Sequence, residues 1–327
     1  MTKNKLPQLP SLLARKIYKT GQTRGADDDV IYQNRVSRNS TVLIPYGEWR
    51  QIQPHIHEIN FENGYIVLIP PTIQHFHQAL QGDLVIGQNS LYFYETRQDW
   101  NTYNPDERHW HVATSRQAPL GGEYVARVPA TTAQQGGRKI NRGFTETRSK
   151  GAGIRFYEYA NSSTIIDCRL QLEAIFWHCY DAMDIIQLAG MTEENALCRK
   201  QAIIQQCEER GLLDYPRLIQ ARILNNQHLT ICPLCLTLLS ARGFLERLPQ
   251  MEGREVPDLT ITQVSLFHIE ELRPGRFNHR PYNLGWGHHH CNVVVKDAGI
   301  MPTLVWLKSI VERNINAGVT IPDHPQN

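Results

Sequence analysis

Two short pairs of metal-binding residue types, far apart in the sequence, constrain this chain most. Cys232 and Cys235 enclose two residues, and His288 and Cys291 repeat that spacing further along. Zn²⁺ takes four sulfur and nitrogen ligands in a tetrahedron, and two such pairs are a common way to supply them. A closed site of four protein ligands is structural, so we expect zinc to staple the C-terminal part of the chain. His289 and His290 are alternatives to His288 as the fourth ligand.

The other cysteines, Cys168, Cys179, Cys198 and Cys207, lie in segments with helical apolar spacing, and we predict that they are buried thiols. The chain has seven cysteines, an odd number, and its N-terminal segment lacks the continuous apolar run of a secretion signal. Both observations argue against a disulfide framework. No apolar run approaches the roughly 18 residues of a membrane span. We therefore expect a cytoplasmic bacterial protein with no membrane partner.

The first half of the chain carries the signals of β-strands, and the middle carries those of helices. Short runs of β-branched and aromatic residues, separated by Gly, Pro and Asn, cover residues 41–46, 64–70, 84–94, 124–128 and 154–159. Apolar residues at helical spacing follow in residues 164–188, 192–210 and 215–224, and again in residues 302–316. The pattern predicts an α+β fold with a β-rich N-terminal part and a helical middle.

Basic residues are clustered, although the net charge of the chain is only +2. Residues 1–26 hold six Lys and Arg side chains and no acid, and residues 138–155 hold six against Glu146 alone. Such stretches, with Asn and Gln among them, suit contacts to phosphates and base edges of DNA. The alternative interpretation is an ordinary solvated surface.

A second spacing pattern surrounds the distal half of the predicted zinc site. It consists of the intervals from His268 to Asn283 and from Asn283 to His288, Cys291 and Asn292. With the upstream Cys-x2-Cys pair, these intervals resemble the HNH endonuclease superfamily over the segment from Cys232 to Lys296. The resemblance implies a ββα-metal module in which His268 ends the first strand, Asn283 sits on the second, and Asn292 begins the helix.

The resemblance also implies a role for each of these residues. A neutral imidazole is a suitable base near pH 7, so His268 would take a proton from the water that attacks the phosphodiester. Asn283 would orient His268, and Asn292 would be a ligand of a Mg²⁺ on the scissile phosphate. Three arginines of the hairpin loop would grip phosphates: Arg273, Arg276 and Arg280.

One position departs from the family pattern. The residue before the base is usually Asp or His and also binds the metal, whereas here it is Phe267, which cannot. Glu270, Glu271 or an extra water on the metal could supply the missing oxygen ligand. Glu270 lies two residues after His268 and would share its face of a strand, so Glu270 is our candidate. Weakened or lost catalysis is the alternative consequence of Phe267.

Most of the chain precedes the zinc and HNH segment, which suits a substrate-reading apparatus. The run KTGQTRGADDDVIYQNRVSRNSTVLIPYGEW, together with the HNH segment, resembles the BstXI-like type II restriction enzymes, which read interrupted palindromes. This resemblance implies a homodimer on double-stranded DNA and a cognate DNA methyltransferase. Because Arg pairs with guanine and Asn with adenine, our candidates for base contacts are Arg35, Asn141, Arg142 and Arg148.

The sequence therefore predicts a Mg²⁺-dependent, site-specific deoxyribonuclease in four regions. These are a β-rich DNA-recognition region (1–160), a helical region (161–228), a zinc-bound HNH module (229–300) and a C-terminal helix with a tail (301–327). A monomeric phage-type HNH nickase is the first alternative. A zinc-stabilised DNA-binding protein with a decayed HNH site is the second, and Phe267 is the residue that favours it.

Overall fold

A computed structural model describes most of the chain as two compact units. It describes residues 6–18, 42–58, 61, 64–72, 84–114, 121–126, 140, 142–143, 159–246, 262–271, 278–296 and 298–320. The first unit comprises residues 1–18, 166–273 and 278–327, and the second comprises residues 19–165 and 274–277. Each unit is described by itself below. No helix within the described residues combines the length and the apolar character needed to cross a membrane.

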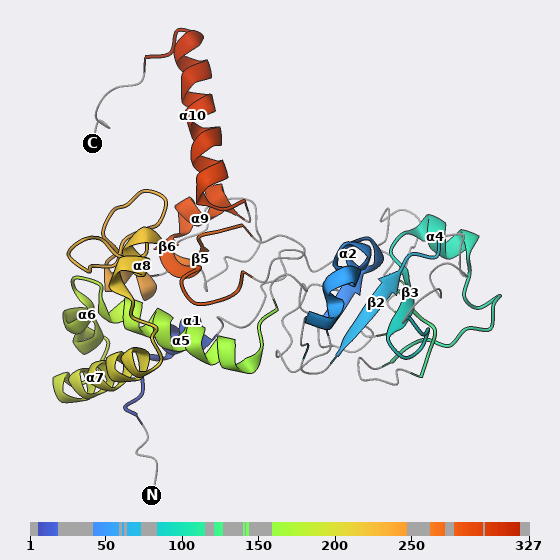
Figure 1. The fold of residues 1–327 in the computed structure, drawn as a ribbon, viewed down its shortest axis with the longest axis horizontal. Helices are drawn as coiled ribbons and strands as arrows, with labels where there is room; N and C mark the ends of the chain where they lie inside the picture. The colour runs from blue at the N-terminus through green and yellow to red at the C-terminus, as the bar shows by residue number, and fades with distance from the viewer. Residues whose placement is uncertain are drawn as a thin grey trace, which may run out of the picture. The chain divides into compact units, whose positions relative to one another are not determined.

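The second unit is built on a four-stranded parallel sheet (Figure 1). Its strands lie in chain order: β1 (Val42–Pro45), β2 (Tyr65–Ile69), β3 (Ser90–Tyr94) and β4 (Tyr124–Ala126). Alternate residues face opposite sides of a sheet, so β1 sends Val42 and Ile44 to one face and Leu43 to the other. Both faces are buried in apolar clusters, as is usual for parallel sheets, which explains why the strands read as nearly continuous apolar runs.

Short helices connect these parallel strands. The helix α2 (Tyr46–Ile52) follows β1 directly and continues into the 3₁₀ helix η2 (Gln53–Glu58), and α4 (Arg97–Thr102) follows β3. The side chain of Thr96 caps α4 by accepting a hydrogen bond from the backbone N–H of Asp99 at 3.1 Å. Helices and strands are mixed as the sequence predicted, and four of the five expected runs contain strands. The parallel arrangement, typical of α/β units, was not part of the prediction, and of residues 154–159 only residue 159 is described.

The first unit contains the helical region. Its helices are α1 (Ser11–Tyr18), α5 (Ser162–Trp177, from residue 166 onward), α6 (Ala182–Leu188), α7 (Glu193–Glu209) and α8 (Tyr215–Gln220). The expected helix over residues 192–210 is confirmed, and Thr192 caps it by accepting from the N–H of Asn195 at 3.3 Å. Helix α8 ends at Gln220, earlier than the predicted end at residue 224, and Arg222 beyond it has a φ of 60°.

The prediction of one helix over residues 164–188 is wrong, because the chain turns between Trp177 and Ala182. Thr230, from outside the helices, donates its hydroxyl to the carbonyl of Ile175 at 2.6 Å and its N–H to the carbonyl of His178 at 3.0 Å. Asp181 accepts from the hydroxyl of Ser240 and from the N–H of Ala241. These tertiary hydrogen bonds pair the polar groups at the turn between the two helices. Apolar periodicity in the sequence does not reveal such a turn.

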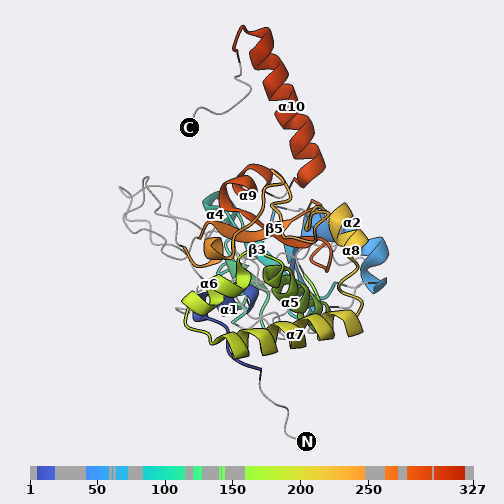
Figure 2. The same ribbon diagram turned by 90° about the vertical axis from the view of Figure 1, so that its left-hand side faces the viewer.

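A β-hairpin and two helices complete this unit. Strands β5 (Val264–His268) and β6 (Leu284–His288) pair antiparallel, and α9 (His289–Val295) follows β6 at once. Helix α10 (Ile300–Asn316) is the last element. The short 3₁₀ helix η5 (Ala241–Phe244) packs beside β5. Helix α10 runs outward from the hairpin and α9 in both views (Figure 1; Figure 2), and it begins at Ile300, slightly before the predicted start at residue 302.

One hydrophobic core joins the helices to the hairpin. The indole N–H of Trp286 on β6 donates to the carbonyl of Leu172 on α5 at 2.8 Å. Gln171, fully buried on the same helix, accepts from the N–H of Tyr282 at 2.7 Å and donates to the carbonyl of Leu212 at 2.9 Å. The hairpin is therefore fixed against α5 by buried hydrogen bonds as well as by apolar packing.

Candidate active site and metal centre

The structure brings together the four predicted zinc ligands. The ligand atoms of Cys232, Cys235, His288 and Cys291 all lie within 4.8 Å of one another. Nδ1 of His288 faces Sγ of Cys235 at 3.4 Å, so His288 rather than His289 or His290 completes the cluster. Zn–S bonds of about 2.3 Å in a tetrahedron place sulfurs about 3.8 Å apart, and three thiols with one imidazole are a usual zinc set. The residues therefore fit Zn²⁺.

Two local structures position the ligands of this cluster, one for each Cys or His pair. Cys232 and Cys235 lie in a tight turn in which the carbonyl of Cys232 accepts from the N–H of Leu236 at 2.8 Å. The guanidinium of Arg222 holds the turn by donating to the carbonyl of Pro233 at 2.8 Å. His288 ends β6 and Cys291 lies in the first turn of α9, so a strand-to-helix junction supplies the second half.

The electrostatics of the cluster favour a cation. Burial, followed by the neighbouring thiols of Cys232 and Cys235, raises the pKa of Cys291 well above its ordinary value. Thiols packed this closely repel one another when ionised, and a bound Zn²⁺ removes that repulsion because it binds them as thiolates. Cys232 and Cys291 are buried whereas Cys235 is exposed, so the cluster lies at the surface of the unit.

Asn283 connects the two sides of the hairpin at the end opposite to the Cys–His cluster. It is 1% exposed and lies directly before β6 rather than on the strand. Its side-chain oxygen accepts from the N–H of Glu270 at 2.7 Å, and its amide nitrogen donates to the carbonyl of Asn278 at 2.6 Å. Asn283 thus holds the segment after β5 against the segment before β6, a placement that suits the orienting role predicted for it.

His268 ends β5, as predicted, and its side chain contacts a second histidine. Nε2 of His268 lies 3.4 Å from Nδ1 of His279, and the two ring centroids are 5.6 Å apart. His279 is buried, at 5% exposed, and belongs to the segment that Asn283 fixes. His268, Asn283 and His279 therefore form one cluster at the loop end of the hairpin.

Phe267 occupies the other face of β5, and the chain is built around it. A Cβ atom on Gly287 would come within 2.4 Å of the Phe267 ring, so β6 carries glycine where the ring needs room. Ser265 shares this face with Phe267, since side chains alternate along a strand. Ser265 accepts from the amide of Asn292 at 3.3 Å, so Asn292 lies on the face opposite to His268. A buried aromatic ring occupies the position where the HNH pattern usually carries a metal ligand.

The candidate metal ligand Glu270 and the candidate phosphate ligand Arg280 contact each other. Their side chains form an ion pair at 3.0 Å, and both are substantially exposed. Within the described residues, three or more His, Cys, Asp or Glu side chains converge on a common point only at the Cys–His cluster. His268 and Glu270 thus belong to no second group of that kind among these residues.

Only some of the candidate DNA-contact residues are among the residues that the structure describes. Arg142 is held inside the second unit: it donates to Asp106 at 2.7 Å and to the hydroxyl of Tyr124 at 3.2 Å, and it lies over the ring of Trp100. The hydrogen bonds to Tyr124 and Asp106 raise the pKa of its guanidinium. Outside the described residues lie Arg35, Asn141, Arg148, Arg273 and Arg276.

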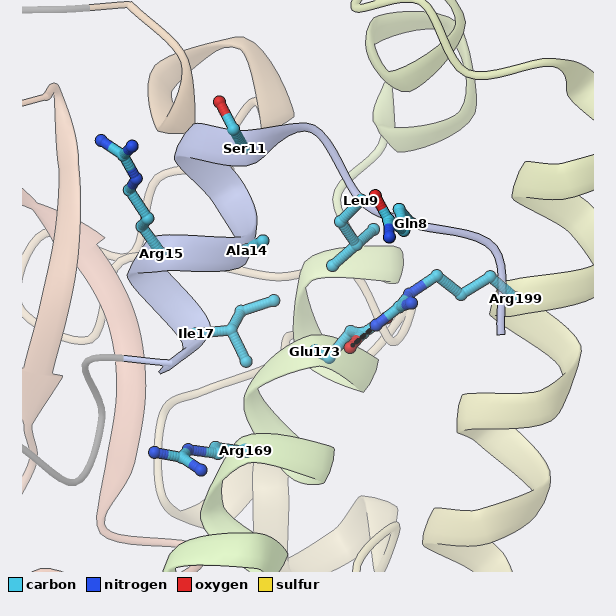
Figure 3. A pocket seen from close by; sticks show the side chains of 9 residues that line it. All are labelled: Gln8, Leu9, Ser11, Ala14, Arg15, Ile17, Arg169, Glu173 and Arg199. Atoms are coloured by element: carbon cyan, nitrogen blue, oxygen red, sulfur yellow. Dashed lines mark hydrogen bonds and ion pairs between the residues drawn. The ribbon is translucent and has the colours of Figure 1, made fainter. Parts of the chain in front are cut away.

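A pocket of about 580 Å³ lies between the N-terminal segment and helices α5 and α7 (Figure 3). The guanidinium of Arg199 points at Glu173 and forms two hydrogen bonds to it, at 2.6 and 2.9 Å, whereas Arg15 and Arg169 point away from that pair. Arg199 also donates to the carbonyl of Pro7. The ion pair therefore fastens the N-terminal segment to both helices.

The comparison with protein families decides the affiliation of the chain. The model of the BstXI restriction endonuclease family matches residues 15–289, which include the β5–β6 hairpin and most of both units. The chain belongs to the BstXI restriction endonuclease family. For this BstXI-family protein, the matched stretch contains His268, His279, Asn283 and three of the four cluster residues, and it ends before Cys291 and Asn292.

The similarity to a solved structure is low. A solved structure described as "Crystal structure of a type II restriction endonuclease" is 15% identical to this BstXI-family chain, with a TM-score of 0.29. The match covers 49% of this chain and 57% of that chain. No curated protein sequence matches.

The sequence analysis missed two residues that lie beside His268 and Asn283, namely His279 and Asn278. Both lie in RFNHRPYN, between Arg276 and Arg280, and neither has a fixed interval in the HNH pattern. Their burial, at 5% exposed for His279 and 6% for Asn278, is visible only in the structure. One expectation for the cysteines was wrong as well: Cys168, Cys179 and Cys207 are buried, but Cys198 lies on an exposed position of α7.

Proposed function

We propose that this protein is a type II restriction endonuclease that hydrolyses double-stranded DNA at a fixed site, with its catalytic residues in the β5–β6 hairpin. The observation that carries the proposal is the placement of His268 and Asn283 at one end of a hairpin whose other end carries the Cys–His cluster. That order of parts, strand, strand and helix with a metal staple, is the one that the HNH resemblance implies. Membership of the BstXI family supports the substrate and the reaction.

In this proposal His268 is the general base. It takes one proton from a water molecule whose oxygen forms a bond to phosphorus, and the bond from phosphorus to the leaving oxygen breaks. Asn283 keeps the strand end that carries His268 in place through its hydrogen bonds to Glu270 and Asn278. Correct placement of such a base contributes about 10²- to 10⁴-fold to a rate.

Glu270 and Asn292 are the residues proposed to hold Mg²⁺. Mg²⁺ keeps several waters and needs only one or two protein oxygens beside the phosphate oxygens. Glu270 follows β5 close to His268, whereas Asn292 contacts Ser265 on the opposite face of that strand, so the two residues are separate candidates for the ion and not one donor set. When bound, the ion would neutralise charge that develops on the scissile phosphate. To hold the ion, Glu270 would have to give up its ion pair with Arg280. Asn292 would use its side-chain oxygen, whereas its hydrogen bond to Ser265 is made by the amide nitrogen.

The Cys–His cluster is proposed to bind a structural Zn²⁺. All four ligands come from the protein, which leaves no open coordination position for substrate. The ion would join the turn after Cys232 to the β6–α9 junction and so fix the start of α9, where Asn292 lies. Its contribution would be to folding rather than to the chemical step.

DNA contacts are proposed for the arginines around the hairpin and in the second unit. Arg280 would be free to bind phosphate if Glu270 held a metal ion, and its bidentate guanidinium is well suited to that ligand. Base contacts are assigned to Arg35, Asn141, Arg142 and Arg148, of which Arg142 first has to leave Asp106. A cognate methyltransferase would protect the same site in the host.

A homodimer is proposed because two strands have to be cut and each chain carries one HNH hairpin. Helix α10 offers a surface for the second copy: Met301, Val305 and Trp306 are 66%, 67% and 52% exposed, far more than apolar side chains of a buried helix. Sedimentation of the wild type should give a dimer, and Val305→Glu with Trp306→Glu should shift it to a monomer. A wild-type monomer would argue for the nickase alternative.

Digestion of a large unmethylated plasmid with Mg²⁺ tests the proposal and its alternatives together. Discrete linear fragments with common ends are expected of a restriction enzyme. Nicked circles that are not cut further would favour the monomeric nickase. Intact plasmid with a stable gel shift would favour a zinc-stabilised DNA-binding protein, and Phe267 would then be the residue that accounts for lost catalysis.

A further inference from the structure

The contact between His268 and His279 carries an inference about how the base is prepared. Their nearest ring nitrogens, Nε2 of His268 and Nδ1 of His279, are 3.4 Å apart, so one of them carries the shared proton and the other accepts it. His279 is 5% exposed and is therefore held in the protein rather than placed on its surface.

The backbone beside His279 is fixed by buried amides. Asn278, the preceding residue, is 6% exposed, and its carbonyl accepts from the side chain of Asn283 at 2.6 Å. The side-chain amide of Asn278 donates to the carbonyl of Glu271, shortly after His268 in the chain, at 2.6 Å. The hairpin thus holds the two histidines together by hydrogen bonds that involve neither imidazole ring.

The proton between Nε2 of His268 and Nδ1 of His279 can be bonded to either nitrogen, and its location determines which nitrogen of His268 is basic. If Nε2 of His268 carries it and donates to His279, the lone pair at Nδ1 of His268 accepts a proton from water. If His279 carries it, the neutral His268 has its proton on Nδ1 and cannot act as a base there. Only the first arrangement is compatible with catalysis from Nδ1.

We propose that His279 is a positioning residue that accepts a hydrogen bond from Nε2–H of His268 and thereby makes Nδ1 the catalytic base; this rests on the proposed role of His268. When Nδ1 takes the proton of water, the resulting imidazolium keeps its Nε2–H bond to His279, so the charged form is stabilised as well. His279 acts through His268 and contacts no reacting atom.

Two substitutions separate this role from simple packing. His279→Asn retains an acceptor, since Oδ1 of Asn stands the same number of bonds from the backbone as Nδ1 of His. His279→Leu fills apolar space but accepts nothing. Loss of an orienting partner of this kind typically costs about 10- to 100-fold in activity, so His279→Leu should lose that much in kcat with KM changed less than about twofold. His279→Asn should recover most of the loss.

A spectroscopic measurement on the full chain complements the kinetics. In ¹⁵N-histidine-labelled protein, the wild type and His279→Asn should show a proton on Nε2 of His268 that exchanges slowly with water, assigned by its absence in His268→Ala. His279→Leu should lose that signal. Melting temperature and zinc content, measured on every variant, identify a protein that has failed to fold.

The outcomes are separable from those for the proposed function. A wild type that never cleaves DNA overturns the proposed function, and the NMR signal still decides whether His279 holds Nε2–H. A cleaving wild type with an unaffected His279→Leu variant overturns the role of His279 alone. A proton found on Nδ1 of His268 in the folded wild type also overturns it.

Discussion

The side-chain oxygen of Asn283 accepts a hydrogen bond from the backbone N–H of Glu270 at 2.7 Å, across the loop end of the β5–β6 hairpin. Because the same amide donates to the carbonyl of Asn278, one buried residue joins the end of β5 to the loop that returns to β6. Asn283 thus contacts the segment that follows His268, although a long loop separates the two residues in the sequence.

Asn283→Ala should destabilise the protein, because it removes the partners of two backbone groups. Each buried polar group left without a partner costs about 1–3 kcal/mol. Urea unfolding should therefore show a lower midpoint, and cleavage should fall as His268 loses its support. Asn314→Ala is the control, since Asn314 is exposed on α10 and donates to the carbonyl of Ile310. Equal stability of the two variants would contradict a structural role for Asn283.

The metal centre could be predicted from sequence because two identical short spacings place four ligands without knowledge of the fold. The choice of His288 over its neighbours could not, since it depends on where β6 ends and α9 begins. Likewise, His268 and Asn283 follow a known interval, whereas the contact with His279 depends on how a loop folds back between them.

The fold was predictable to a similar degree. Runs of β-branched residues indicated most strands of the second unit, but strand direction depends on connections that periodicity does not describe. The turn between α5 and α6 was missed because Thr230 and Asp181 stabilise it through tertiary hydrogen bonds. Phe267 was recognised as a departure, but its matching residue, Gly287, became apparent only from the packing of the hairpin.

Purified protein should contain one Zn²⁺ per chain, and Cys235→Ser should lose it. Because metal binding is coupled to folding in such sites, the variant and chelator-treated wild type should both melt at lower temperature. Cys198→Ser, which changes an exposed thiol outside the cluster, should keep its metal and its melting temperature. Elemental analysis and thermal melts measure both quantities. Metal-free wild type with an unchanged melt after chelation would refute a zinc staple.

Alkylation with iodoacetamide at pH 8 should distinguish the cysteines of α5 and α7. Burial raises the pKa of both Cys168 and Cys207 to about 12, so at pH 8 these groups remain thiols rather than reactive thiolates. Cys198, which is exposed, should react first. Mass spectrometry of the peptides reports the order, with urea-unfolded protein as the fully reactive control. Equal rates in the folded chain would disagree with the described packing.

Glu173→Gln should be among the most destabilising changes of a charged residue in this chain. The carboxylate of Glu173 is 6% exposed and holds Arg199, and breaking a buried ion pair from one side costs about 3–5 kcal/mol. Glu312→Gln, in an exposed pair with Lys308, should change stability by less than about 0.5 kcal/mol. Urea unfolding of both variants measures the difference. A small effect at Glu173 would mean that the N-terminal segment is fastened by other contacts.

The central claim, that His268 is the base of a metal-dependent DNA endonuclease, is tested most directly by single-turnover cleavage of a DNA fragment that carries the recognition site. With Mg²⁺, His268→Ala should be slower than wild type by about 10²- to 10⁴-fold. His111→Ala, which changes an exposed histidine of the second unit, should cleave at the wild-type rate. Cleavage by His268→Ala at the wild-type rate, or wild-type cleavage that needs no divalent metal, would contradict the account.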